Sequence, residues 1–582
     1  MIFVVFFLFN VKINFGEYFM KRILTILLMI ISILLLTSCS FEEINKEDEG
    51  TNSSIDDVTT STPILPSDEV LPTPNEVISL NYNEKLKAFI DKSYVNDDEF
   101  YNYIATCEEY NYNEELSLDA IYVSPDGNGS GYSIDDPCSI YDAVNKVSAG
   151  ETIYLRGGNY DLKGTVYLTE SGTENNYITI RNYPNEHVYI SSSKQNIDKY
   201  NKNHEYALIA LTEGLSYIKI EGLEIADVSK KNVLGIVAWE GGQHHIIIRN
   251  NKIHDLKTNS NNIYDEDSGA NAILLLGEIE ESINNFLIYG NECYNNETGW
   301  CETISISSNC ENIYVIENYV YDNSNIGIDF YGNAGYCDNK ALDQPRNCIA
   351  ALNRVESSVC EYADAAGLYV DGARDILLTN NYIKNSQYGI EIGAEELSEG
   401  YPVKNIIVRN NVLYKNTTCG LRVVGYDAVE CGYVTSTKIY NNTIINSSSS
   451  VSGVITISKV DGIEFKNNLI YSGIDVTLVM TDMSKTYLKN ITFNNNYFGV
   501  YKKSQEELTF KVFGQKQKGL SAFNEIVLGD NISGEIEFDK SYRVVSGVTI
   551  NAGDNSVLSG MYDYEFKKRI NGNTIDIGAF EY

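Results

Sequence analysis

The sequence predicts an all-β fold, a parallel β-helix in which the chain winds through one coil per repeat. A phrase of the form apolar-x-x-Asn-x-apolar occurs nine times, with successive asparagines 26 to 40 residues apart. Within each copy the apolar residues recur with a period of two, which indicates strands and not the helical repeats of similar length. Such a unit buries its apolar face only against its neighbours, which is typical of a solenoid. The repeated asparagines are Asn251, Asn291, Asn318, Asn353, Asn381, Asn411, Asn442, Asn468 and Asn496.

The asparagine of each copy is expected to lie at a sharp bend of its coil. Stacked side-chain amides would hydrogen-bond from coil to coil, and asparagine also tolerates the left-handed conformation that bends often need. The residue two positions later is apolar in every copy, from Ile253 to Phe498, and is expected to point into the core.

Residues 1–38 are expected to form an export signal. Met20-Lys21-Arg22, the apolar run Ile23–Leu36 and Leu36-Thr37-Ser38-Cys39 together resemble bacterial lipoprotein signals. The resemblance implies that residues 1–38 are removed, and that Cys39 is lipidated and holds the protein on the outer side of the bacterial cell membrane. Residues 1–19 contain a second apolar stretch with no basic start, so translation is expected to start at Met20. The alternative is an uncleaved anchor, for which the 14-residue run is short against the ~20 residues that span a bilayer.

Four further segments follow the signal. Residues 39–79 are rich in Glu, Asp, Ser, Thr and Pro and are predicted to form a solvated linker. Residues 80–118 carry apolar side chains at mixed spacing and are predicted to form short helices that cap the first coil. The β-helix is predicted over 119–545, with a closing segment over 546–582.

Both ends of the predicted solenoid carry recognisable strings. Ser124–Gly131, Ala149–Tyr160, Tyr177–Pro184 and, at the end, Arg569–Glu581 resemble bacterial secreted right-handed parallel β-helix proteins. This group includes pectate lyases and several glycoside hydrolases. The resemblance implies a right-handed coil and a carbohydrate-active protein, but lyases, hydrolases and non-catalytic proteins share these strings.

Charge and cysteines restrict the partners. The formal net charge of −36 argues against binding nucleic acid or anionic lipid, and a polyanionic polysaccharide would need a bridging divalent cation.

Ten cysteines follow Cys39. The candidates for loop disulfides are Cys337, Cys348 and Cys360, and the pair Cys419 and Cys431. Burial of the cysteines as small apolar residues is the preferred interpretation. We expect a monomer whose only membrane contact is its lipid.

Four strands in the middle coils align without gaps, beginning at Gly327, Gly367, Gly389 and Gly420. With a side-chain period of two, their outward positions form two adjacent columns. The first column reads Ser305, Asp329, Tyr369, Glu391, Arg422. The second reads Ser307, Tyr331, Asp371, Gly393, Val424.

These columns are the candidate active site. Asp371 and Glu391 should have backbones roughly 8 Å apart, given coils about 4.8 Å apart and residues two apart along a strand separated by about 6.6 Å. Inverting glycosidases place their acid and base carboxyl groups about 6.5–9.5 Å apart. The candidate catalytic residues are Asp371, Glu391, Asp329 and Arg422. The candidate substrate-binding residues are Tyr331, Tyr369 and Trp239, as flat faces for sugar rings, with Asp364, Glu395 and Asp427 in flanking loops.

Three functions remain open at this point. The favoured one is a polysaccharide hydrolase, which requires no cofactor. The second is a pectate-type lyase, in which Asp329, Asp364, Asp371 and Glu391 would hold Ca²⁺ and Arg422 or Lys384 would remove the C5 proton. The third is a non-catalytic glycan binder or adhesin. In the simplest interpretation, the acidic column is only a solvated wall with an ion pair between Glu391 and Arg422.

Overall fold

The computed structural model describes residues 80–582 except 193–205, 261, 263, 264, 266, 267, 428, 450, 451, 482–484 and 558. All of them belong to the unit Ile64–Tyr582. The signal at 1–38, Cys39 and the linker to 79 lie outside the described residues. Among the helices that are described, none has the length and apolar character needed to cross a bilayer.

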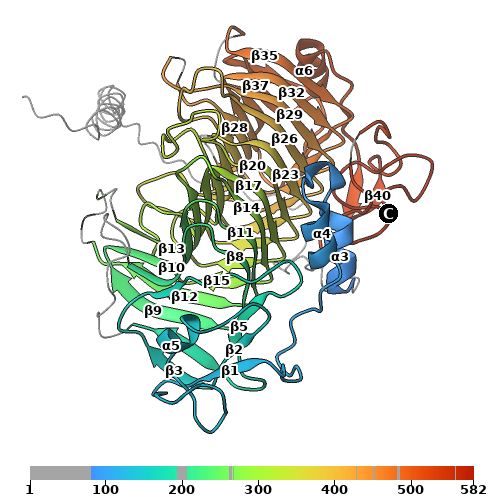
Figure 1. Cartoon of the computed structure of the whole chain (residues 1–582). Helices are drawn as coiled ribbons and strands as arrows, with labels where there is room; N and C mark the ends of the chain where they lie inside the picture. The colour runs from blue at the N-terminus through green and yellow to red at the C-terminus, as the bar shows by residue number, and fades with distance from the viewer. Residues whose placement is uncertain are drawn as a thin grey trace, which may run out of the picture. The chain divides into compact units, whose positions relative to one another are not determined.

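The chain coils through three parallel sheets, and Figure 1 shows their strands following one another in chain order along the stack. Sheet A consists of β1 Ala120–Val123, β2 Thr152–Leu155, β5 Ile178–Asn182, β8 Ser216–Glu221, β11 His244–Arg249, β14 Ile283–Tyr289, β17 Cys310–Ile316, β20 Arg346–Ala351, β23 Arg374–Thr379, β26 Val403–Arg409, β29 Val434–Tyr440, β32 Val460–Lys466 and β35 Leu488–Asn494. Sheet B consists of β3 Gly158–Asp161, β6 Val188–Ser191, β9 Glu224–Lys230, β12 Lys252–Thr258, β15 Glu292–Tyr294, β18 Tyr319–Tyr321, β21 Arg354–Glu356, β24 Tyr382–Lys384, β27 Val412–Tyr414, β30 Thr443–Ile445, β33 Leu469–Ser472 and β36 Tyr497–Val500. Sheet C consists of β4 Val166–Leu168, β7 Tyr206–Leu211, β10 Asn232–Glu240, β13 Gly269–Gly277, β16 Ile304–Ser308, β19 Ile328–Tyr331, β22 Ala366–Asp371, β25 Tyr388–Gly393, β28 Cys419–Val424, β31 Ile455–Ser458, β34 Thr477–Thr481, β37 Thr509–Val512 and the antiparallel β38 Gln515–Lys518. The predicted parallel β-helix is confirmed.

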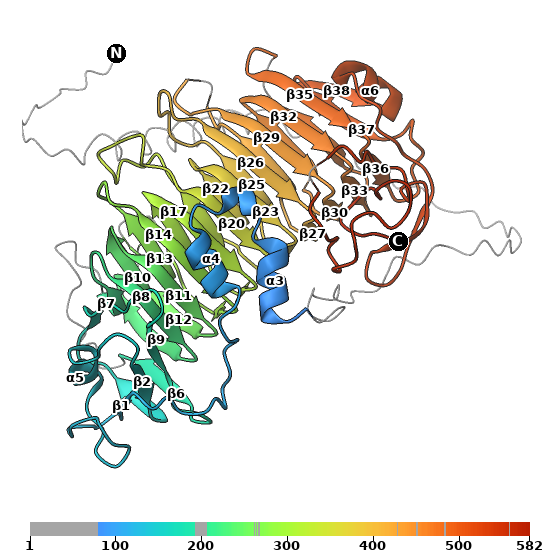
Figure 2. The same ribbon diagram turned by 45° about the vertical axis from the view of Figure 1, so that its right-hand side comes forward.

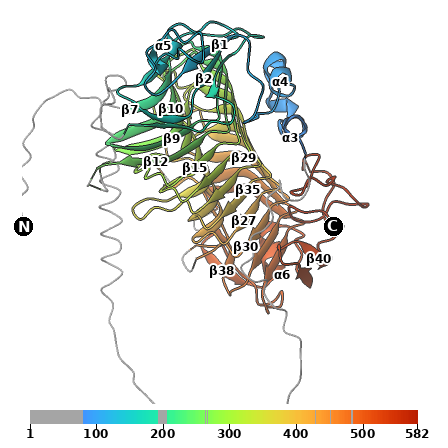
Figure 3. The same cartoon turned by 90° about the horizontal axis from the view of Figure 1, so that it is seen from below.

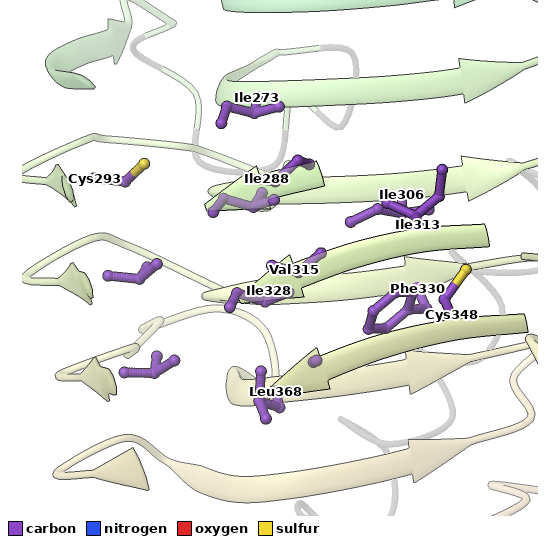
Figure 4. Close-up of a cluster of buried hydrophobic side chains, with 14 of the residues drawn as sticks. Ile273, Ile288, Cys293, Ile306, Ile313, Val315, Ile328, Phe330, Cys348 and Leu368 are labelled. Atoms are coloured by element: carbon purple, nitrogen blue, oxygen red, sulfur yellow. The ribbon is translucent and has the colours of Figure 1, made fainter. Parts of the chain in front are cut away.

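The core runs through the middle of the coil, between the three sheets. Figure 4 shows side chains of successive coils stacked in rows, such as Ile273, Ile328 and Leu368 from sheet C. The predicted inward positions of the Asn repeat, among them Ile253 and Phe498, are fully buried. Because each coil buries its apolar row against the rows above and below, the structure grows by addition of coils.

The asparagine ladder is confirmed. It begins at Asn251, and Asn531 extends it by one member beyond the nine predicted asparagines. In one rung, the backbone N–H and the side-chain Nδ2 of Asn381 both donate to Oδ1 of Asn411, at 2.9 and 3.0 Å. Nδ2 of Asn381 also donates to the carbonyl of Ala350 in the preceding coil, at 2.9 Å. The left-handed backbone lies one residue earlier than expected, at Asn380 with φ 55°. The ladder asparagine is therefore selected for its amide, and its predecessor for the bend.

The N-terminal segment is helical as predicted, but it does not cap the first coil. Helices α3 (Tyr82–Phe89), η1 (Lys92–Tyr94) and α4 (Asp98–Ile104) pack against the outer face of sheet A, where Phe89 and Phe100 join a cluster that includes Leu287 and Ile349. Figure 2 shows α3 and α4 alongside the middle coils. The first coil is instead covered by α5 (Ile140–Val144), which contacts β1, β2 and β4. The outward face of sheet A carries apolar side chains such as Leu287, which explains the lateral position of the helices.

The stacked coils end earlier than the predicted boundary at 545. The last parallel pairing between strands joins β34 to β37, and an isolated parallel bridge follows between Tyr497 and Ile532. Helix α6 (Leu520–Val527) covers this end (Figure 3). The chain then forms the hairpin β39 (Ile536–Phe538) and β40 (Val544–Gly547). The closing segment packs against sheet B through Tyr564, Ile577 and Phe580.

All ten described cysteines are free thiols, so none of the candidate loop disulfides is formed. Eight of the ten are buried. Cys293 lies in the core row as predicted, and burial raises the pKa of its thiol.

Candidate functional site

The first predicted column is present on sheet C. The strand register places Ser305 beside Asp329, Asp329 beside Tyr369, Tyr369 beside Glu391, and Glu391 beside Arg422. Because parallel strands in successive coils keep the same register, the sequence alignment alone was sufficient to bring these residues together.

The second column is interrupted. Ser307 pairs with Tyr331, and Asp371 pairs with Gly393, but Tyr331 forms an isolated antiparallel bridge with Gly372 and does not pair with Asp371. A Cβ on Gly372 would lie 2.1 Å from the carbonyl oxygen of Gly332, and Gly372 has φ 72°. The two segments that follow β19 and β22 therefore leave the sheet in close contact at these glycines. The parallel pairing of β19 with β22 ends at Phe330 and Val370.

The acidic side chains on this face of sheet C are buried. Their outward positions on the strands had implied that they would be open to solvent. Asp329, Asp371 and Glu391 are buried, with Glu391 only 1% exposed. Loops after β25 and β28 cover them: Glu395 donates its backbone N–H to Oδ1 of Asp371 at 3.3 Å, and the Tyr426 hydroxyl donates to Glu391. The face is therefore not a plain solvated wall, although the ion pair between Glu391 and Arg422 that this interpretation includes is present.

One half of the site is organised by a guanidinium. Nη1 of Arg422 lies 2.7 Å from Asp364 and 3.1 Å from Glu391, so one cation bridges two carboxylates. The Arg422 guanidinium lies over the ring of Tyr388, 4.7 Å from its centroid, and the Tyr388 hydroxyl donates to Asp364 at 3.1 Å. Asp364 is the accessible member, because 52% of its side chain is exposed.

The other half is organised by two phenols. The Tyr369 and Tyr426 hydroxyls are 2.8 Å apart, and the Tyr369 hydroxyl donates to Glu395 at 2.9 Å. Because the Tyr426 hydroxyl donates to Glu391, and Glu395 reaches Asp371 through its backbone, polar contacts link Asp371 to Glu391. Burial raises the pKa of both tyrosines, so they act here as neutral donors.

Burial also sets the protonation of the carboxyl groups. It raises the pKa of Glu391 to about 7, against the opposing effects of Arg422 and the Tyr426 hydrogen bond. It raises the pKa of Asp329 as well, with help from the nearby charges of Glu302, Asp371 and Glu395. Oδ1 of Asp329 has no hydrogen-bond partner among the described residues. Glu391 is therefore poised to exchange a proton near neutral pH.

Other predicted residues lie outside this network. Trp239 is buried against Leu276 and Val237, and its indole N–H donates to Glu278, so it offers no open face to a sugar. Asp427 accepts the backbone N–H of Val429 at 2.7 Å, inside its own loop. Tyr331 packs edge-on with Tyr336. Lys384 lies on sheet B and so cannot share a site with Arg422 on sheet C.

Three residues of the network were not predicted from sequence, namely Tyr388, Tyr426 and Glu302. Tyr388 begins β25 directly before Gly389, and this position was available to the alignment that found Glu391. Tyr426 and Glu302 lie outside the aligned strands, where the period of two gives no information.

The four residues named for Ca²⁺ do not fit that ion as a set. Ca²⁺ requires six to eight oxygen ligands, yet Asp364 and Glu391 both face the Arg422 guanidinium. Within the described part of the chain, no group of three or more His, Cys, Asp or Glu side chains is arranged to hold a metal ion.

Residues 121–418 match the family described as "Pel9A-like, right handed beta helix region". The chain belongs to this Pel9A-like family, and the expected right hand of the coil is thereby confirmed.

Individual relatives differ in how much of the chain they cover. An uncharacterised protein of Bacillus subtilis, YwoF, is 31% identical over 376 residues, which is 62% of this chain and 75% of that protein. Pectate lyase PEL9 of Emericella nidulans is 43% identical over 76 residues, 13% of this chain and 18% of that protein. The crystal structure of pectate lyase Pel9A covers 80% of this chain and 97% of its own, with 14% identity and a TM-score of 0.41.

Proposed function

We propose that this protein hydrolyses glycosidic bonds of an extracellular polysaccharide, with Glu391 as general acid and Asp371 as general base. The observation that carries the proposal is the pKa of Glu391, raised to about 7 by burial beside the Arg422 guanidinium. A carboxylic acid that holds its proton near neutral pH is what protonation of a leaving glycosidic oxygen requires.

The second carboxyl group is assigned from the register. Asp371 pairs with Gly393, two residues after Glu391 on the neighbouring strand. One coil and two residues correspond to a backbone separation of roughly 8 Å. Parallel side chains would keep the carboxyl groups at a similar distance, and inverting enzymes hold theirs about 6.5–9.5 Å apart. Glu391 would give its proton to the leaving oxygen as the C1–O bond breaks, and Asp371 would take a proton from the water that attacks C1. Each turnover would then produce one new reducing end.

Substrate access requires movement of the residues that cover the two carboxyl groups, Tyr426 over Glu391 and Glu395 over Asp371. Tyr426 covers Glu391, and Glu391 is 1% exposed. Asp364 is held by Arg422 and Tyr388, and its exposed carboxylate would meet a sugar hydroxyl first. In this mechanism a bound sugar displaces the Tyr426 hydroxyl and takes its place beside Glu391.

A pectate-type lyase is the second candidate, because the family and the 76-residue match to pectate lyase PEL9 favour it. The side chains support it less well. The Arg422 guanidinium lies between two carboxylates that raise its pKa, so it would keep its proton and would be a poor base for the C5 hydrogen. A non-catalytic glycan binder is the third candidate.

One experiment separates the three candidates. A soluble fragment starting at residue 40 is incubated with a panel of neutral and acidic polysaccharides, with and without Ca²⁺, while absorbance at 235 nm and reducing ends are followed. Reducing ends without a 235 nm product support the hydrolase. A rise at 235 nm means a lyase, and retention on a polysaccharide column with neither signal means a binder.

The membrane tether belongs to the same proposal. The lipoprotein-like signal ending at Cys39 would place the enzyme at the outer surface of the bacterial cell membrane. The solvated linker at 40–79 would then let it reach a substrate outside the cell.

A further inference from the structure

A second polar site lies on sheet A, away from the acidic column on sheet C. Its floor is made by outward side chains of successive coils, in which Thr152, Thr179 and Lys219 form one column and Arg181, Glu221 and Arg249 form the next. Its roof is the segment that follows α4, which contributes Glu108 and Glu114. The space between floor and roof is about 220 Å³, far more than the roughly 10–15 Å³ that one water molecule needs.

The roof is fixed to the floor by contacts of its main chain as well as its side chains. Nη2 of Arg181 donates to the carbonyl of Asn111 at 2.6 Å, and Nη1 of Arg249 donates to the carbonyl of Glu108 at 2.8 Å. The Tyr110 hydroxyl donates to Asn182 at 2.8 Å. The cavity is therefore a built part of the fold and not a gap beside a loose loop.

The carboxylates at the cavity are already engaged. Glu221 lies 2.6 Å from Nε of Arg249 and 3.1 Å from Nη1 of Arg181, and Glu114 forms an ion pair with the same Arg181. The backbone carbonyl of Glu108 accepts a hydrogen bond from Arg249, and Glu108 is an exposed residue.

Two donors remain without an acceptor. Nε of Arg181 is buried and has no hydrogen-bond partner, in a side chain that is 2% exposed. Lys219 forms no salt bridge within the described residues; its ammonium lies 5.3 Å from the ring centroid of Tyr103 and 5.5 Å from that of Tyr177. The lining thus holds three basic and three acidic residues, and Lys219 is the basic one that forms no salt bridge within the described residues.

We propose that this cavity binds a small oxyanion, a carboxylate or a phosphate, between Lys219, Arg181 Nε and the hydroxyls of Thr152 and Thr179. A buried donor without an acceptor is unfavourable, and an oxyanion would supply acceptors to both. The size of the cavity allows an acidic monosaccharide, and the site is independent of the proposed catalytic column.

Thermal unfolding and titration calorimetry of the soluble fragment test the proposal, with glucuronate, inorganic phosphate and uncharged glucose as probes. Saturable binding of glucuronate or phosphate, with little or no effect of glucose, is the expected result, and comparison of the two anions identifies the preferred oxyanion. Binding of glucose as strong as that of glucuronate, or no binding by either anion, would overturn it.

Variants locate the binding. Lys219→Met should weaken anion binding at least tenfold, while Lys252→Met, a half-exposed lysine on sheet B, should leave it unchanged. If Lys219→Met does not fold, Thr179→Val removes one proposed hydroxyl donor without touching a charge and should weaken binding several-fold. Equal affinity in the wild type and the folded variants would place the anion elsewhere and refute the assignment.

Discussion

Glu391 and Arg422 occupy the same position in neighbouring coils, and Nη1 of Arg422 lies 3.1 Å from Oε1 of Glu391. Glu391 is the buried member of the pair, because only 2% of its side chain is exposed. A carboxyl group beside a cation normally has a low pKa, but here the loss of hydration outweighs the cation, and the pKa rises to about 7. Whether Glu391 holds its proton near neutral pH therefore depends on the balance between burial and the Arg422 charge.

Replacing either proposed proton-transfer group should remove most of the activity. Glu391→Gln and Asp371→Asn should each lower kcat by ~10²–10⁴-fold, the usual contribution of a positioned acid or base. Initial rates on the polysaccharide that the wild type degrades measure the effect. Glu464→Gln, the same substitution on sheet A, is the matched control and should keep full activity. Wild-type rates in both site variants would mean that the catalytic groups lie elsewhere.

The charge of Arg422 should appear in the pH profile. A general acid must be protonated, so kcat/KM should fall as pH rises through the pKa of Glu391 near 7. Arg422→Gln removes the cation that favours the ionised form, so the pKa of Glu391 should rise and the alkaline limb should move to higher pH. Arg422→Lys keeps the charge and should leave the limb close to its original position. An unmoved limb in Arg422→Gln would show that Glu391 is not the titrating acid.

The parts predicted correctly from the sequence are those set by a strict period. The Asn251–Asn496 ladder and the Asp329–Arg422 column follow from coils that stack in one register, so alignment of the repeats was enough. The position of Tyr426 was not predictable, because it depends on the path of a loop outside the repeat. The burial of Glu391 was missed for the same reason, since the loops that cover it carry no periodic signal.

The ladder should contribute measurably to stability. Asn381 is fully buried, and Asn381→Ala would leave the backbone and side-chain donors of Asn353 without their acceptor. The cost should be about 1–3 kcal/mol of unfolding free energy, measured by urea denaturation. Asn175→Ala, at an exposed loop position, should change it by less than about 0.5 kcal/mol. An equally small change in Asn381→Ala would contradict a structural role for the ladder.

The proposed anchoring would rest on one thiol. Cys39→Ser should move the protein from the membrane pellet to the soluble fraction, because the following linker has no apolar segment that could hold it. Fractionation of cells that express the full chain measures this, with Ser40→Ala as the matched control that should stay in the pellet. Retention of Cys39→Ser in the membrane would show instead that Ile23–Leu36 is an uncleaved anchor.

The closing segment should make stability depend on pH. Burial raises the pKa of Glu581 to about 7, even though Arg569 lies 3.6 Å away, whereas the ordinary value is 4.5. Because the folded form binds this proton more tightly than the unfolded chain, the stabilisation is complete below pH 4.5 and is lost as pH rises to 7. The loss of stabilisation should reach up to about 3 kcal/mol, since each pKa unit corresponds to about 1.4 kcal/mol.

Two variants test this pH dependence. Glu581→Gln should make the unfolding free energy depend less on pH between pH 5 and 7 than in the wild type. Glu213→Gln, at an exposed position, should leave the slope unchanged. An identical slope in wild type and Glu581→Gln would mean that Glu581 is ionised in the folded protein throughout this range.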